Sequence, residues 1–332
     1  MKSIAKFSVL LIAAAVLSAC GGGGGAGAPA PATATGAAAP APITLPSAPV
    51  AAGYAAGSQQ GEAFALLNSE RVKCGFGSLA KSAALDAAAG GHANFLAENG
   101  TSYGHYEVAG LPGFTGVSEQ HRAGAQGYLD PVAAVLAVSN GTLAASQART
   151  IPVQVRDILA APYHLLGAID DYSEVGVGYA SKVTNGNQEK KALNFTLGKP
   201  GTKPLDAAQV YTYPCEGSTS VNWQLANETP SPIPLNLAQD YKLYGSPIAV
   251  KLRTGRVLSL TSVTLTPAAG GTAVAAQIVD LSNTPRPDLM RADSAYLLPT
   301  SPLTPGISYT VQLAGTSDGV AFTKSFTFTT SN

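Results

Sequence analysis

Two histidines carry the most recognisable chemistry in this sequence. His105 lies in the stretch Ser102-Tyr-Gly-His-Tyr-Glu107, and His164 follows some sixty positions later in Ala161-Pro-Tyr-His164. An imidazole titrates close to neutral pH and can serve as a general base or as a metal ligand. We predict that the two histidines face each other across one cleft, as a catalytic or metal-binding pair. Glu107 is the acid nearest to His105 in the sequence and is a candidate catalytic partner.

The residues around His164 predict the end of a helix and then a core strand. Pro162 should interrupt that helix, because proline lacks an N–H and disfavours helical angles in the residue before it. Glu174–Ala180 alternates like a strand, and glycines inside a strand often mark a place where another group approaches the backbone. Ala192–Leu197 alternates similarly and is expected to pair with it through a turn at Asn185-Gly186.

Two helices are predicted ahead of His105. Glu62–Lys73 and Ser82–Asn99 both carry apolar residues at helical spacing, and a glycine closes each of them. His92 falls on the apolar face of the second helix, where a hydrogen-bonded core histidine is more common than a ligand. His121 lies in a polar stretch and is expected to be solvated. The apolar run Pro131–Val138 fits a strand or a short helix.

The composition excludes one class of partner and leaves room for two domains. The chain has 332 residues, a formal net charge of zero and only 12% charged residues, so it lacks the electrostatic signature of a nucleic-acid-binding protein. Hydrophobic residues make up 45% of the chain, which is ample for a packed core.

The first 57 residues predict export and anchoring to a membrane. Residues 1–19 combine two lysines with a short apolar run, as a signal peptide does, and Leu17-Ser-Ala-Cys20 resembles the bacterial lipobox. We expect lipidation of Cys20, and the alternative is ordinary cleavage beside an incidental cysteine. The glycine after Cys20, by resemblance to Gram-negative sorting, favours an outer-membrane lipoprotein. Residues 20–57 are nearly all Gly, Ala, Pro, Thr and Ser, which predicts a disordered tether.

Cys74 and Cys215 lie in the part of the chain that is expected to fold. An exported chain meets an oxidising compartment, where two cysteines of one domain usually pair. We therefore predict a Cys74–Cys215 disulfide, with two buried free thiols as the alternative.

An ordered set of these stretches resembles the SCP-like domain found in bacteria. This domain belongs to the CAP superfamily of cysteine-rich secretory proteins, antigen five and plant pathogenesis-related proteins. The resemblance spans about residues 58–217. It rests on Leu67-Asn-Ser-Glu-Arg71, the Ala-rich helix with His92, the loop with His105, Ala161-Pro-Tyr-His164 and Glu174-Val-Gly-Val-Gly-Tyr179. It implies an α-β-α sandwich with a cleft of two histidines and two glutamates, which in some members binds a divalent metal.

In this resemblance His105 matches the first histidine of the family and His164 the second. They are the implied ligands of a divalent metal such as zinc. The glutamate expected in a Gly-Glu pair has no counterpart, because residues 135–138 contain no acid, and the second glutamate has no clear match. Two histidines are fewer ligands than zinc generally takes. The resemblance therefore predicts a weak or vestigial metal site.

The last third of the chain predicts an all-β module. After a Pro-rich linker at residues 218–236, residues 237–332 contain short alternating runs that are separated by turn signals such as Thr304-Pro-Gly306. The end of the chain resembles bacterial immunoglobulin-like modules, which are often spacers or adhesive units. The predicted fold class is therefore α+β, with a CAP-type α-β-α sandwich over residues 58–217 followed by an all-β immunoglobulin-like sandwich.

Three functions fit these features. The first is an envelope-anchored module that binds a small apolar, lipid or cell-envelope ligand in the two-histidine cleft, as the family's lipid and sterol binders imply. The second is a hydrolase in which His105 or His164 acts as general base with help from Glu107, with or without a metal. The third is an adhesive or structural protein whose cleft is unused.

Overall fold

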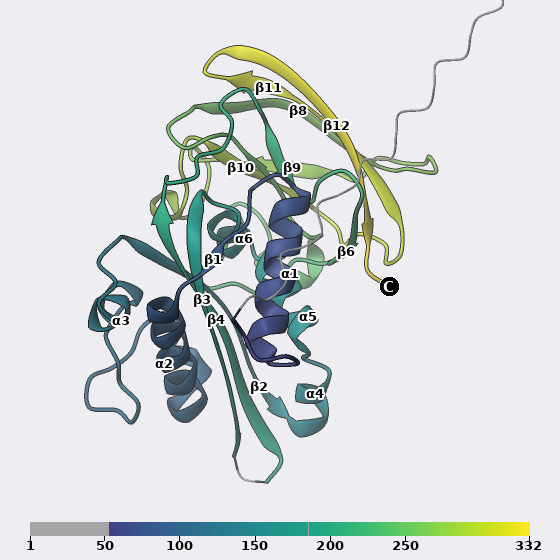
Figure 1. The fold of residues 1–332 in the computed structure, drawn as a ribbon. Helices are drawn as coiled ribbons and strands as arrows, with labels where there is room; N and C mark the ends of the chain where they lie inside the picture. The colour runs from purple at the N-terminus through teal and green to yellow at the C-terminus, as the bar shows by residue number, and fades with distance from the viewer. Residues whose placement is uncertain (1–52, 185) are drawn as a thin grey trace, which may run out of the picture. The chain divides into compact units, whose positions relative to one another are not determined.

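Regular structure starts at Gln59 in the computed structural model, which describes residues 53–184 and 186–332 (Figure 1). The predicted signal peptide, Cys20 and most of the tether lie outside the described residues, so these predictions stay predictions. All described residues belong to one compact unit. None of the helices within them has the length and apolar character needed to span a membrane.

The described residues form six α-helices, three short 3-10 turns and twelve strands. The helices are α1 (Gln59–Lys73), α2 (Ala83–Asn99), α3 (Glu119–Ala125), α4 (Leu143–Gln147), α5 (Ile151–Leu159) and α6 (Pro162–Ala168), and the turns are η1 (Thr101–Tyr103), η2 (Tyr241–Leu243) and η3 (Pro287–Leu289). The strands are β1 (Ala80–Lys81), β2 (Val132–Thr142), β3 (Tyr172–Thr184), β4 (Gln188–Pro200), β5 (Tyr211–Tyr213), β6 (Ser218–Val221), β7 (Ile248–Lys251), β8 (Leu258–Pro267), β9 (Ala276–Val279), β10 (Ser294–Pro299), β11 (Ser308–Ser317) and β12 (Val320–Thr330).

The first sheet has the strand order β1-β3-β4-β2. The predicted hairpin is confirmed, because β3 and β4 pair antiparallel along their whole lengths, with Val177 opposite Phe195. The undecided run Pro131–Val138 lies largely within β2, which pairs antiparallel with β4. The predicted break at Pro162 is also present, since α5 ends at Leu159 and α6 begins at Pro162.

Helix α2 runs alongside β3 and β4, and glycines make this close packing feasible (Figure 1). A Cβ atom at Gly176 would lie 1.9 Å from the carbonyl carbon of Leu85, and one at Gly178 would lie 2.1 Å from the carbonyl oxygen of Ala89. No side chain fits at such distances. The strand glycines therefore let the helix backbone approach the sheet, as the sequence predicted.

The other large helices contact the same sheet and enclose its core. Helix α1 packs on α5 and β3, while α5 and α6 contact β2. The core between them is buried and aliphatic or aromatic, and includes Leu67, Val155, Leu165 and Phe195. Serines at the N-caps of α1 and α2 accept hydrogen bonds from the first turns, which fixes where these helices begin.

The remaining strands form two further sheets, with orders β5-β7-β10-β9 and β6-β12-β11-β8. A second buried core includes Val250, Leu297, Val311 and Phe328, which come from strands of both sheets. Strand β5 pairs with β7, and β6 pairs parallel with β12. Both short strands therefore belong to the same sheets as the C-terminal third of the chain.

The predicted fold class is wrong. The described part of the chain is dominated by twelve strands in three four-stranded sheets, so it does not form the predicted CAP-type α-β-α sandwich. The two C-terminal sheets do fit the predicted immunoglobulin-like module. The error has a physical cause. Strands β5 and β6 flank the position 217/218, and main-chain pairing with β7 and β12 is not visible in the side-chain pattern of such short runs.

The disulfide Cys74–Cys215 is present, as predicted, with the two Cα atoms 5.4 Å apart. It joins the end of α1 to the segment between β5 and β6. A buried ionic network makes a second connection: the Lys251 ammonium lies 2.7 Å from Asp293 and 3.2 Å from Asp170, which follows α6. Arg291 also contacts the Asp170 carboxylate, at 2.5 Å.

Candidate functional site

The structure brings His105 and His164 together. Their Nε2 atoms lie 3.3 Å apart, and their ring centroids are 5.4 Å apart with planes tilted by 21°. Because the centroids are farther apart than the nitrogens, the Nε2 edges face each other and the ring faces do not overlap. Both residues are partly buried. The site therefore presents two imidazole nitrogens to one point in space.

Helix α6 positions His164. The helix begins with Pro162, which has no N–H, and it has no capping side chain of its own. Its next N–H groups belong to Tyr163 and His164, and both donate to the carboxylate of Glu228, at 3.1 and 2.8 Å. Glu228 thereby satisfies N–H groups that a helix start otherwise leaves free.

Glu228 also fixes the ring of His164. Its Oε1 lies 2.5 Å from Nδ1 of His164, and the two side chains are 1% and 13% exposed. A carboxylate accepts a hydrogen bond, so Nδ1 of His164 carries a hydrogen. When the ring is neutral, its lone pair is therefore on Nε2, which faces His105. The backbone of Glu228 is held in turn, since its carbonyl accepts a hydrogen bond from Tyr241.

The loop between η1 and α3 positions His105. Its carbonyl accepts a hydrogen bond from Arg122 of α3 at 3.0 Å. Burial, with smaller contributions from His164, His92 and Arg122, lowers the pKa of His105 to about 3. His105 is therefore neutral at physiological pH, with a nitrogen lone pair available as an acceptor or ligand.

Glu107 does not join the histidine pair, contrary to its proposed catalytic role. Its carboxylate is buried and contacts Nδ1 of His92 at 3.0 Å, while the N–H groups of Thr115 and Gly116 donate to it at 2.6 and 3.2 Å. Glu107 is therefore buried in the protein interior, and its partners are His92, Thr115 and Gly116. The acid at the pair is Glu228.

The other two histidines lie where the sequence predicted. His92 is fully buried on α2 and hydrogen-bonded through both ring nitrogens, to Glu107 and to the carbonyl of Gly104. His121 is exposed on α3, and its Nδ1 contacts the hydroxyl of Ser118 at 2.9 Å. Neither ring reaches the His105–His164 pair through a hydrogen bond.

The donor set fits a loosely held divalent metal only in part. Two nitrogen ligands at the usual zinc distance of about 2.0–2.1 Å and a tetrahedral angle lie roughly 3.3–3.4 Å apart. The observed separation of 3.3 Å between the two Nε2 atoms matches this ligand-to-ligand distance. Across the described residues, however, no cluster of three or more histidine, cysteine, aspartate or glutamate side chains is placed to hold a metal. The described residues therefore offer His105 and His164 as ligands, and further coordination positions of an ion held there would be open.

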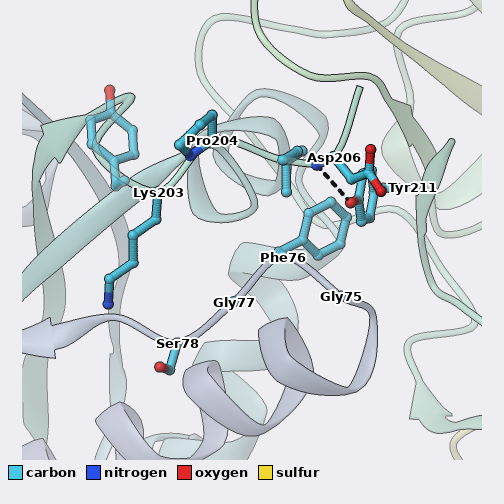
Figure 2. A pocket seen from close by; sticks show the side chains of 10 residues that line it. Gly75, Phe76, Gly77, Ser78, Lys203, Pro204, Asp206 and Tyr211 are labelled. Carbon is cyan, nitrogen blue, oxygen red and sulfur yellow. Dashed lines mark hydrogen bonds between the residues drawn. The ribbon is translucent and has the colours of Figure 1, made fainter. Parts of the chain in front are cut away.

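A separate hollow of about 230 Å³ lies between the loop after α1 and the segment before β5 (Figure 2). Phe76 and Tyr211 form one side of it, with ring centroids 5.7 Å apart, and Lys203 and Ser78 line the other (Figure 2). A second hollow lies beside the disulfide and is lined by Cys74 and Cys215. His105, His164 and Glu228 line neither hollow.

The sequence did not point to Glu228, because residues 218–236 are predicted to be a Pro-rich linker between domains. The available signal was modest: Glu228 is a lone acid among prolines and small residues. Its partner His164 is 64 positions away in the sequence. No local spacing connects the two, so only the folded chain shows the contact.

Comparison with known proteins gives little further guidance. No protein-family model and no curated protein matches the chain. One solved structure that resembles it is the crystal structure of a DUF4426 family protein from Pseudomonas aeruginosa PAO1. The match has 17% sequence identity, covers 29% of this chain and 72% of the other, and has a TM-score of 0.22.

Proposed function

We propose that this protein is an envelope-anchored binding module that holds a divalent metal ion of the zinc type between His105 and His164. The open coordination positions of the ion would accept a donor group of a lipid or cell-envelope ligand. The observation that carries the proposal is the 3.3 Å separation of the two Nε2 atoms, with Glu228 on the far nitrogen of His164.

Three properties of the pair support metal binding. The spacing equals that of two ligands on a tetrahedral zinc ion. His105 is neutral well below physiological pH, so protons do not compete for its lone pair there. Glu228 provides the carboxylate that metal-binding histidines commonly have on their second nitrogen, which orients the ring and raises its basicity. With two protein ligands, we expect a weak and exchangeable ion.

The anchoring part of the proposal rests on the sequence alone. The lipobox-like stretch Leu17-Ser-Ala-Cys20 and the glycine that follows it favour a lipoprotein of the outer membrane. Lipid on Cys20 would keep the histidine site close to envelope ligands. The immunoglobulin-like resemblance of the C-terminal strands supports a surface role in the same way.

The test measures zinc binding to the full chain, purified without a polyhistidine tag, by competition with a chromophoric chelator. We expect one zinc ion per chain for the wild type and none for His105→Ala or His164→Ala. Glu228→Gln should weaken binding by about 10–100-fold, as loss of a carboxylate behind a metal-bound histidine usually does. His121→Ala is the matched control, because the ring of this exposed histidine contacts Ser118 and makes no hydrogen bond to the pair, and it should bind like the wild type.

Two results would overturn the metal proposal. One is a wild type that binds no more zinc than His105→Ala. The other is an equal loss in His121→Ala, which would show that binding is nonspecific.

One observation favours a second candidate, the histidine-dependent hydrolase. The Glu228–His164 contact at 2.5 Å resembles the acid–histidine pairing that makes an imidazole a general base. This function predicts turnover of small ester or peptide substrates that survives a chelator and disappears in Glu228→Gln and His164→Gln. Absence of chelator-resistant turnover would exclude it.

A further inference from the structure

A buried charged cluster lies behind His105 and has no place in the proposed binding site. It consists of His92 on α2, Glu107 in the loop after η1, and Arg122 on α3. Their exposed fractions are 0%, 2% and 1%. Burying three ionisable side chains is costly unless they are paired. In this cluster each of the three side chains makes hydrogen bonds.

The cluster holds the two ends of the loop that carries His105. On one end, the Gly104 carbonyl accepts from Nε2 of His92 at 2.8 Å, and the His105 carbonyl accepts from Arg122. On the other end, the Thr115 and Gly116 N–H groups donate to Glu107, and the Gly116 carbonyl accepts from Arg122 at 3.1 Å. The backbone on both sides of His105 is therefore tied to these three side chains.

The contact between His92 and Glu107 must contain a hydrogen. The Gly104 carbonyl can only accept, so Nε2 of His92 carries a hydrogen. In the neutral ring, Nδ1 would then present a lone pair to the Glu107 oxygen at 3.0 Å. One extra proton, on His92 or on Glu107, makes this contact attractive. A glutamine at position 107 would supply the same hydrogen permanently from its amide, and its oxygen could still accept from Thr115 and Gly116.

We infer that Glu107, with His92 and Arg122, is a positioning residue that holds His105 opposite His164 and does not itself act on the ligand. A test of this inference by zinc affinity rests on the proposed function. A test by NMR of the His105 ring does not depend on zinc.

Two substitutions at one position separate positioning from direct action. Glu107→Gln keeps the hydrogen-bond geometry and removes the carboxylate, whereas Glu107→Ala removes both. If Glu107 positions His105, Glu107→Gln should bind zinc within about threefold of the wild type, and Glu107→Ala should bind at least tenfold more weakly, like other losses behind a metal ligand. Glu98→Gln is the control, because Glu98 forms an exposed ion pair with Lys182 elsewhere on α2.

A second measurement does not depend on metal. The chain has four histidines, so NMR of chains labelled with ¹⁵N only at histidine can follow each ring, with assignments from single substitutions. The ring ¹⁵N and ¹H chemical shifts of His105 should be the same in the wild type and in Glu107→Gln, and they should change in Glu107→Ala as the ring leaves its place opposite His164. If Glu107→Ala does not fold, Arg122→Lys takes its place, because lysine keeps the charge but loses the paired contacts to the His105 and Gly116 carbonyls.

The outcomes are distinct. If Glu107→Gln behaves like Glu107→Ala, the carboxylate acts directly and the inference is wrong. If Glu107→Ala, or Arg122→Lys in its place, leaves the His105 ring unchanged, the cluster does not position it and the inference is also wrong. If the wild type binds no zinc but the His105 ring responds as expected, the metal proposal fails while the positioning role stands.

Discussion

At the scale of single residues, the acid that completes the histidine pair comes from an unexpected part of the chain. Glu228 sits in a stretch of prolines and contacts both the ring and the backbone N–H of His164. Glu107 is much closer to His105 in the sequence, but it is buried and contacts His92 instead. Which acid becomes the partner of a histidine depends on which backbone segment lies next to that histidine in the fold. The number of residues between the acid and the histidine in the sequence does not decide it.

The lowered pKa of His105 predicts how stability depends on pH. Because folding lowers this pKa from 6.5 to about 3, the unfolded chain binds the proton more readily than the folded chain. The contribution of His105 is thus complete above about pH 6.5, declines as the pH falls, and is lost by about pH 3. We expect the wild type to lose on the order of 1–3 kcal/mol more unfolding free energy than His105→Asn between pH 7 and pH 4.

Urea unfolding of both proteins at several pH values measures this difference. Parallel stability curves for the wild type and His105→Asn would contradict it, since they would mean that the ring is protonated as easily in the folded state as in the unfolded one.

At the scale of elements, the sequence was most informative where periodicity was long. The helix over Glu62–Lys73 and the helix over Ser82–Asn99 correspond to α1 and α2 within a few residues. The hairpin of β3 and β4 and its glycine contacts with α2 also followed from local pattern. The run at Pro131–Val138 stayed ambiguous, because a short apolar run has no period that separates a buried strand from a helix.

The close approach of α2 to β3 predicts a large effect from a single methyl group. In Gly176→Ala the new Cβ would meet the backbone of Leu85 and Asp86 at 1.9 and 2.1 Å, so the helix must move away. We expect a loss of roughly 3 kcal/mol in unfolding free energy, at the upper end of usual overpacking costs. Chemical denaturation followed by circular dichroism measures it.

Gly90→Ala, on helix α2 itself, is the matched control for the new methyl group on β3. Apart from the backbone of its own helix, no atom lies within 4 Å of a Cβ built at Gly90. Alanine favours a helix over glycine by about 0.5–1 kcal/mol. This variant should therefore be slightly more stable than the wild type. Equal effects of the two substitutions would show that the helix and strand are not in backbone contact.

At the scale of the whole molecule, the sequence indicated the disulfide and the strands of the C-terminal third. It did not indicate that β5 and β6 pair with strands of the C-terminal third. Export and the two cysteines predicted Cys74–Cys215 without knowledge of the fold. The strands β5 and β6 are three and four residues long, too short to show alternation, and their partners lie far along the chain. Pairings of that kind are set by tertiary packing, which a single sequence does not display.

The disulfide predicts a stability effect that involves the whole chain. Cys74 and Cys215 are 141 positions apart, so the bond closes a long loop in the unfolded state. The double variant Cys74→Ala/Cys215→Ala should lose about 2–5 kcal/mol in unfolding free energy. Thermal and urea unfolding with and without a thiol reductant measure this loss. The double variant should not respond to the reductant, and an unchanged midpoint in the double variant would contradict the prediction.

Helix α6 is held at its start by Glu228, and Asp170 just beyond its end is bound by Lys251 and Arg291. All three of these side chains lie after position 217. A chain cut at that position would keep both imidazoles yet lose the groups that orient one of them. Residues 53–217 alone therefore lack the acid that orients His164, and a chain with a different C-terminal part would need another acid for this ring.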